Sequence, residues 1–159
     1  MDYDNSAGYT LIESLVVLAI VGAVVISVPA MLQWVRQQGI HHAVDQIRAD
    51  LQSAKMMAIR QKQICRLQFN SPTGNRYINT ITGRQTDLQA FRGGVHFLDH
   101  GPDGRKMASE ASFNSRGMSC SVIPTNILIG DELGLETYCI RILLPGGVSV
   151  YRWDGGAWK

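Results

Sequence analysis

Residues 8–35 read GYTLIESLVVLAIVGAVVISVPAMLQWV, and this stretch decides the fold class of the protein. From Ser14 to Val35 it holds 22 consecutive uncharged residues, most of them Val, Leu, Ile and Ala. At a rise of about 1.5 Å per residue, a helix of this length spans roughly 33 Å, close to the thickness of a bilayer's hydrocarbon core. The run lacks the polar stripe of a helix that packs on a soluble core. It therefore predicts a membrane helix.

A removable secretory signal peptide would need a basic start, a shorter apolar stretch and a small-residue cleavage site after that stretch. Here the small residues Ala7 and Gly8 precede the apolar run. The first eight residues carry Asp2 and Asp4 but no Lys or Arg. The pattern argues against an ordinary signal peptide.

Glu13 is the one charged residue between Asp4 and Arg36. A carboxylate within an apolar span costs on the order of 3 kcal/mol, so it normally has a partner or a function. On a helix, Glu13 lies one turn after Tyr9 and on the same face. A cut between Gly8 and Tyr9 would place a new amine near this carboxylate or near that of a neighbouring chain. The alternative is that Glu13 lies at the membrane interface with its carboxylate in water.

The segment from Gly8 to Ile20 resembles the N-terminal signature of type IV pilins and type II secretion pseudopilins. The resemblance implies that a prepilin peptidase cuts after Gly8 and methylates the new N-terminus at Tyr9. It also implies that Glu13, the fifth residue of the mature chain, aids docking into a growing filament. Two features depart from the family pattern: Tyr9 stands where phenylalanine is usual, and the leader is acidic where the family's is basic.

Gly22 and Pro29 interrupt the apolar helix. Proline removes a backbone hydrogen bond and favours a kink, which neighbouring helices can accommodate within a membrane. The family resemblance implies local melting of the helix near Pro29 inside the filament. A gentle kink without a function is the alternative.

After Trp34 the apolar residues recur at steps of three and four, which predicts an amphipathic helix. The stripe consists of Ile40, Val44, Ile47, Leu51, Ala54 and Ala58. We expect one long helix from about Thr10 to about Gln63, weakened at Gly39. The predicted organisation is a leader at 1–8, a membrane or filament-core helix at 9–35, its amphipathic half at 36–63, and a periplasmic β-rich domain at 64–159.

The remainder of the chain reads as short strands and turns. The clearest hairpin joins 138–144 to 148–153 through Pro145-Gly146-Gly147. The other expected strands are 64–69, 76–82, 95–98 and 112–114. The predicted fold class is therefore α+β, with a long N-terminal helix packed on a small antiparallel β domain, as in pilins. The helix stretch 51–63, the Phe113–Gly117 segment and the closing hairpin are similar to those of GspH/FimT-type minor pseudopilins.

Three cysteines lack the close spacing of a zinc or redox motif. In an exported domain, Cys120 with Cys139 or Cys65 with Cys139 would form a disulfide, whereas three buried small thiols are the alternative. Asp99–Gly104 is more simply a turn than a calcium loop. We expect no metal, no cofactor and no catalytic site, because no phosphate loop, serine elbow or zinc-protease motif is present.

Residues 36–159 carry all 15 Lys and Arg and a net charge of +5, a mild excess. The resemblance implies a minor subunit at the tip, or in priming, of a type II secretion pseudopilus, held in the inner membrane by a single span with its domain in the periplasm. Its partners would be other pilin subunits, the prepilin peptidase, the inner-membrane assembly platform and, before assembly, lipid. The alternative is a type IV pilus minor pilin that binds DNA in transformation. Against it, only Arg141 and Arg152 lie near Gly147, and DNA binding needs clustered cations.

Overall fold

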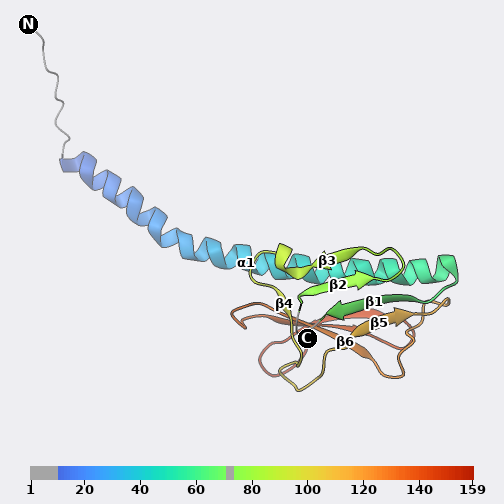
Figure 1. Ribbon diagram of the computed structural model, residues 1–159. Coiled ribbons are helices and arrows are strands. Elements are labelled where there is room, and N and C mark those ends of the chain that lie inside the picture. The colour runs from blue at the N-terminus through green and yellow to red at the C-terminus, as the bar shows by residue number, and fades with distance from the viewer. Residues whose placement is uncertain (1–10, 71–73) are drawn as a thin grey trace, which may run out of the picture. The chain divides into compact units, whose positions relative to one another are not determined.

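The computed structural model describes residues 11–70 and 74–159, apart from the side chains of 26–30, 32–33, 36 and 70. Its one long helix, α1, runs from Leu11 to Gln61 (Figure 1). The chain divides into two units, Met1–Trp34 and Val35–Lys159, and α1 contributes to both. The second unit contains all of the strands and the core.

The end of α1 is determined by its last residues. Lys62 adopts a left-handed conformation with φ of 52°, which stops the helix. The amide of Gln63 then donates to the carbonyl of Ala58 at 3.3 Å. These are the features of a Schellman-type cap, here with lysine where glycine is usual. The chain leaves the helix and enters the first strand three residues later.

Among the residues that the structure describes, eight strands form two antiparallel sheets. The first sheet has the order β3-β2-β1-β5, with β1 at Cys65–Asn70, β2 at Arg76–Asn79, β3 at Gln85–Asp87 and β5 at Glu110–Phe113. The second has the order β4-β6-β7-β8, with β4 at His96–Phe97, β6 at Thr125–Gly130, β7 at Thr137–Ile142 and β8 at Val148–Arg152. A short 3-10 helix, Leu88–Ala90, follows β3.

One hydrophobic core joins α1 to both sheets, and in Figure 1 the second half of α1 lies along them. The whole predicted stripe of the helix is buried, which confirms the amphipathic pattern: Ile40, Val44, Ile47, Leu51, Ala54 and Ala58. On the second sheet, Ile127 and Ile129 face the core from β6, and Ile140 and Ile142 face it from β7. Alternation along these strands places the intervening residues on the opposite face.

The α+β fold class predicted from the sequence is confirmed, and the closing hairpin forms between β7 and β8 with Ile142 opposite Val148. Two strands, β3 and β6, were not predicted. The predicted strand at 76–82 stops at Asn79, because the Asn79 side chain accepts hydrogen bonds from the amides of Ile81 and Thr82 and turns the chain.

Gly39, which was predicted to weaken the helix, instead lies where α1 packs against a loop. It is buried within α1, and a Cβ atom there would lie 1.7 Å from the carbonyl oxygen of Arg92. Glycine at this position therefore permits close contact between the helix and the loop before β4. It is a packing requirement of the second unit.

A buried hydrogen bond ties α1 to the first sheet. Tyr77 on β2 is 2% exposed, and its hydroxyl donates to Asp50 Oδ2 at 2.5 Å. Burial, together with this bond, raises the pKa of Tyr77 above its usual range. Asp50 also accepts a hydrogen bond from Gln46 at 3.1 Å.

We expect Tyr77→Phe to lower the free energy of unfolding by about 1 kcal/mol, because it removes this bond while Asp50 keeps its contact with Gln46. Urea denaturation followed by circular dichroism measures the change. Tyr151→Phe is the matched control, since the Tyr151 hydroxyl makes no hydrogen bond among the described residues. An equal loss in both variants would show that the Asp50 contact contributes nothing specific.

Candidate functional site

The described part of the N-terminal segment begins with the first turn of α1. Gly8 and Tyr9 lie outside the described residues, so cleavage between them and methylation of Tyr9 stay predictions. Glu13 lies in the first turn of α1 and is exposed. A carboxylate there interacts favourably with the positive end of the helix dipole.

Apolar side chains cover the surface of this first stretch of α1. Every residue from Leu11 to Val25 is exposed, and Leu11, Ile12 and Leu18 are each more than 70% exposed. An apolar surface of this extent marks a site of contact with lipid or with other protein. The sequence pattern and the exposure therefore identify the same interaction surface.

Within the described residues, no helix carries an apolar stretch long enough to cross a membrane. The membrane helix predicted at 9–35 includes residues and side chains outside that part of the chain. Its span stays a prediction.

The two predicted helix breaks, Gly22 and Pro29, lie inside α1, which is assigned as one helix from Leu11 to Gln61. No atom outside the helix's own backbone would lie within 4 Å of a Cβ at Gly22. Glycine is therefore not required there by any contact among the described residues. A functional kink at either residue stays a prediction.

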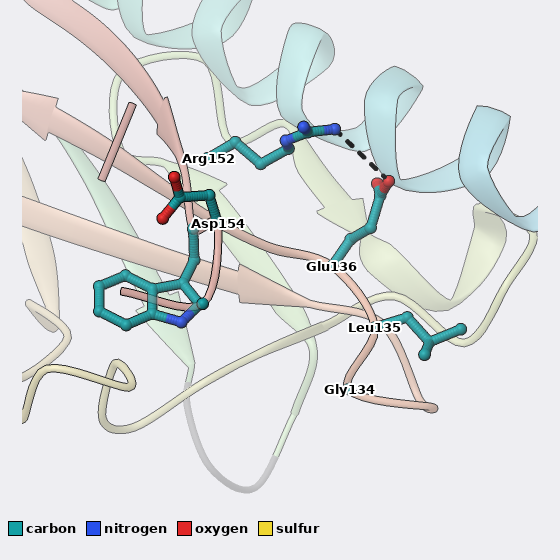
Figure 2. A pocket seen from close by; sticks show the side chains of 7 residues that line it. Gly134, Leu135, Glu136, Arg152 and Asp154 are labelled. Carbon is teal, nitrogen blue, oxygen red and sulfur yellow. Dashed lines mark ion pairs between the residues drawn. The ribbon is translucent and has the colours of Figure 1, made fainter. Parts of the chain in front are cut away.

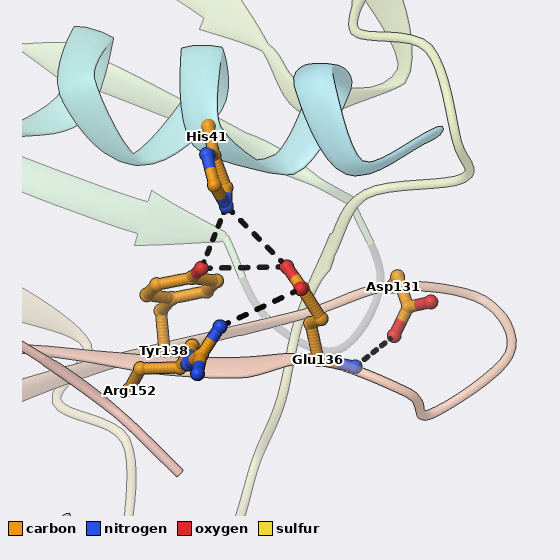
Figure 3. A network of polar contacts seen from close by, with 5 residues as sticks. All are labelled: His41, Asp131, Glu136, Tyr138 and Arg152. Atoms are coloured by element: carbon orange, nitrogen blue, oxygen red, sulfur yellow. Dashed lines mark hydrogen bonds and ion pairs between the residues drawn. The ribbon is translucent and has the colours of Figure 1, made fainter. Parts of the chain in front are cut away.

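A polar network joins α1 to the second sheet, as Figure 3 shows. His41 Nε2 lies 2.8 Å from the hydroxyl of Tyr138, which donates in turn to Glu136 Oε2 at 3.3 Å. The tautomer of His41 decides which of the two groups donates in the 2.8 Å contact. Burial and the Glu136 carboxylate raise the pKa of Tyr138.

Glu136 is the centre of this network. Its carboxylate lies 3.5 Å from His41 Nε2 and 4.0 Å from Arg152 Nη1, and its amide donates to Asp131 Oδ1 at 2.9 Å. These contacts join residues of α1, of β7 and of the turn before β7. They hold the turn between β6 and β7 against α1.

A surface depression of about 500 Å³ lies beside the network, and Glu136 and Arg152 point toward each other across it in Figure 2. Asp154, also in its lining, pairs with Lys159, which lowers the pKa of the Asp154 carboxyl to about 2. Each of these charged groups thus has a partner within the chain.

A second depression, of about 370 Å³, is lined by aromatic and arginine side chains from β7, β8 and the C-terminal segment. The rings of Trp153 and Trp158 lie 5.2 Å apart, and Arg105 stacks over Trp158. Arg105 also pairs with Asp103 at 2.6 Å. Sequence reasoning missed Arg105, since it reaches this region from a loop 36 residues before Arg141.

The arginines considered for DNA contact are occupied within the fold. Arg141 stacks over Tyr151 and donates to Asn126 at 3.1 Å, whereas Arg152 faces Glu136. Phosphate binding requires cations that are clustered and available. This arrangement weakens the case for a nucleic-acid interface here.

The sequence left open a disulfide of Cys139 with Cys120 or with Cys65, or three buried thiols. All three cysteines are free, with Cys65 and Cys139 buried and Cys120 exposed. Cys139 lies on β7 opposite Tyr151, whereas Cys120 lies in the loop after β5. Burial raises the pKa of the Cys139 thiol to about 11 and also raises that of Cys65.

We expect one thiol per native chain to react with a maleimide at pH 7 and three to react after unfolding. Thiolates are the reactive form, and burial protects Cys65 and Cys139. Intact-mass analysis counts the labels. In Cys120→Ser the native count should be zero, and a native count of one in that variant would contradict the assignment.

Groups of three or more His, Cys, Asp or Glu side chains that could hold a metal ion are absent from the described part of the chain. The predicted turn at Asp99–Gly104 is closed by a hydrogen bond from the amide of Gly104 to the carbonyl of Gly101 at 2.9 Å.

Comparison with known proteins adds to this geometry. Residues 3–28 match the family model of the prokaryotic N-terminal methylation motif. The fold is similar to one crystal structure of the type IV minor pilin FimU of Pseudomonas aeruginosa, with a TM-score of 0.50 and 14% identity over 75% of this chain and 96% of that one. The fold is pilin-like, and it follows a segment that carries the methylation motif.

A second crystal form of FimU aligns with this pilin-like chain at a TM-score of 0.47 and 15% identity, over 84% of this chain and 96% of that one. No curated protein sequence matches the chain. The motif covers the segment that contains Gly8, Tyr9 and Glu13, and the shared fold covers the domain that follows.

Proposed function

We propose that the chain is a minor pilin or pseudopilin subunit, which is cut after Gly8, methylated on Tyr9 and assembled into a pilus-like filament. The observation that carries the proposal is the first stretch of α1. The methylation motif at residues 3–28 overlaps the start of this helix. The side chains from Leu11 to Val25 are all exposed and, with few exceptions, apolar. A surface of this kind needs lipid before assembly and other subunits after it.

The two units have different proposed roles. The first α1 stretch docks into a filament core, where Glu13 meets the new amine of Tyr9 on its own or a neighbouring chain. The second unit folds around its own core, because the residues of that core all lie at or beyond Ile40. We propose that the subunit is held in the inner membrane with this domain in the periplasm until the assembly platform inserts it.

Within the family, we propose a GspH/FimT-type minor subunit of a type II secretion system, placed at the tip or used in priming. The order of elements supports this: a helix ending at Gln61, a strand from Cys65, and a closing β7–β8 hairpin. A minor pilin of a type IV pilus is the alternative. DNA capture by that alternative is disfavoured, because Arg105, Arg141 and Arg152 have partners within the domain.

The test is intact-mass analysis of the protein from host membranes, with and without the prepilin peptidase. We expect the loss of residues 1–8 and the gain of one methyl group on Tyr9, both dependent on the peptidase. Gly8→Val should remain uncut, whereas Asn5→Ala, inside the leader, should be processed normally. An uncut wild-type chain in peptidase-positive cells would overturn the proposal.

A further inference from the structure

An exposed apolar surface lies at one end of the second unit and takes no part in its core. We call it the apolar end, and its side chains are those of Met118, Val122, Ile123, Leu143 and Leu144. Val122 and Ile123 protrude furthest, since they are 90% and 72% exposed. Neither depression described above is lined by any of these residues. The surface therefore projects into solvent and is not the wall of a pocket for a small ligand.

The apolar end is contiguous because two loops leave the second sheet at the same place. Thr125 at the start of β6 is paired with Ile142 at the end of β7, so the residues just before Thr125 lie next to those just after Ile142. The amide of Ser119 also donates to the carbonyl of Leu144 at 3.1 Å. The apolar side chains of the two loops therefore form one patch.

The last turns of α1 border this patch. Lys55 donates from its ammonium group to the carbonyl of Gly146 at 2.9 Å. A Cβ atom at Gly117, the residue before Met118, would lie 2.8 Å from the side chain of Ile59. These contacts fix both loops on the C-terminal end of the helix, and they bring the cations of that end to the patch.

The first sheet brings a further cation from the other side. The amide of Cys120 donates to the carbonyl of Ser112 at 3.0 Å, and Ser112 on β5 is paired with Arg66 on β1. Neighbouring strands lie about 4.8 Å apart, so the backbone of Arg66 is about 10 Å from that of Cys120. Cations therefore approach the patch both from α1 and from the first sheet.

The chain around the apolar end is basic throughout. The segments that meet there, 51–66, 114–125 and 142–150, contain no Asp or Glu. They hold five cations: Lys55, Arg60, Lys62, Arg66 and Arg116. None of the five forms an ion pair with any residue that the structure describes. Their charge is therefore not neutralised within the described part of the chain.

This combination of groups indicates the kind of partner. Protruding aliphatic side chains with a basic border are typical of surfaces that lie in a membrane interface, where the apolar groups enter the boundary of headgroups and acyl chains and the cations meet anionic lipid. A nucleic acid would use the cations, but its bases stack on aromatic rings, and the three segments contain no Phe, Tyr or Trp. An anionic lipid surface is the partner that uses both features.

We propose that the apolar end binds the surface of an anionic phospholipid bilayer. Val122 and Ile123 enter the interface, and Arg116 is among the cations that meet the lipid phosphates. The contact is peripheral and reversible, because a few aliphatic side chains and cations hold a membrane far less firmly than a spanning helix does. It is separate from the exposed apolar stretch at Leu11–Val25, which belongs to the other unit. The inference goes beyond the proposed function and does not depend on cleavage after Gly8.

Vesicle sedimentation with the full chain tests the contact. The apolar stretch of α1 is first held in a phosphatidylcholine nanodisc, so that this stretch is not free to bind the added vesicles. Sucrose-loaded vesicles of phosphatidylcholine, or of equal parts phosphatidylcholine and phosphatidylglycerol, are then added and pelleted. We expect about tenfold stronger binding to the anionic vesicles and release by salt, because each cation near an anionic surface contributes about fivefold. Nanodiscs without the protein should stay in solution.

Substitutions of the protruding side chains show whether the apolar end makes the contact. Val122→Ser together with Ile123→Ser should lower binding to anionic vesicles about tenfold, because two exposed aliphatic side chains are lost. The matched control is Leu133→Ser together with Leu135→Ser, which removes two exposed leucines from the acidic turn before β7. This control should bind as the wild type does. All four positions are exposed, so circular dichroism should show the same fold in both variants.

A charge variant completes the test. Arg116→Gln should lower binding about fivefold, whereas Arg48→Gln, which changes an exposed arginine earlier on α1, should leave it unchanged. Failure to pellet with anionic vesicles, equal binding to neutral vesicles, or equal losses in the control variants would overturn the proposal. Pelleting only with vesicles that contain host membrane proteins would also overturn it, because the apolar end would then bind a protein.

Discussion

Glu13→Ala is expected to remove the subunit from filaments while leaving its domain folded. Glu13 is the single charged residue in 5–35, and burial of its carboxylate in an apolar filament core is tolerated only with a cationic partner. The new amine of Tyr9, one helical turn away, is that partner in the proposed function. In the variant, the amine of Tyr9 would be buried in the filament core without its carboxylate partner, at a cost on the order of 3 kcal/mol. A cost of this size lowers the equilibrium constant for incorporation by about two factors of ten, so we expect sheared filaments to contain at least tenfold less of the variant.

The measurement is the ratio of the subunit in sheared filaments to the subunit in membranes. Ser14→Ala, which changes an exposed neighbour without altering charge, should assemble normally. Because the core begins at Ile40, the unfolding midpoint of the domain should be the same in both variants. Normal incorporation of Glu13→Ala would show that the carboxylate has no role in docking.

Gly39→Ala is expected to destabilise the domain by about 2 to 3 kcal/mol. The added methyl would be placed 1.7 Å from the carbonyl oxygen and 2.6 Å from the carbonyl carbon of Arg92. These are backbone atoms, so the loop before β4 must shift as a whole. Alanine improves helix propensity by about 1 kcal/mol, but overpacking of a buried contact costs up to about 3 kcal/mol or more, and the second effect dominates.

Urea unfolding of the full chain in detergent, followed by circular dichroism, measures this change. Gln38→Ala, at the exposed neighbouring position, should stay within about 0.5 kcal/mol of the wild type. If Gly39→Ala instead proved more stable than the wild type, helix propensity would outweigh the clash, and the loop would have to be easily displaced. Processing at Gly8 should be unaffected in either variant.

These two substitutions illustrate which features local sequence can reveal. The apolar run, its single carboxylate and the stripe from Ile40 to Ala58 are periodic patterns within one element. A helix imposes such patterns whatever it later packs against, so α1 and its buried face could be predicted. The hairpin of β7 and β8 was predictable for the same reason, because its turn residues lie between the two strands.

β6 was missed because its short segment, Thr125–Gly130, follows a proline and is buried on both faces, so it shows no alternation. Gly39 was misjudged because its partner, Arg92, lies 53 residues away. The sequence left two disulfide pairings and three free thiols open, because spacing along the chain does not show that Cys139 is buried in the sheet whereas Cys120 is exposed in a loop.

By itself, then, the sequence determined the helix, the face it buries, the α+β class and the likeness of the N-terminal segment to pilins, since each depends on residues that are neighbours in the chain. Only the tertiary structure decided that Glu136, Tyr138 and His41 meet and that the arginines near the C-terminus are paired. The physical reason is that these contacts join segments up to 97 residues apart, whose meeting depends on how the whole core packs.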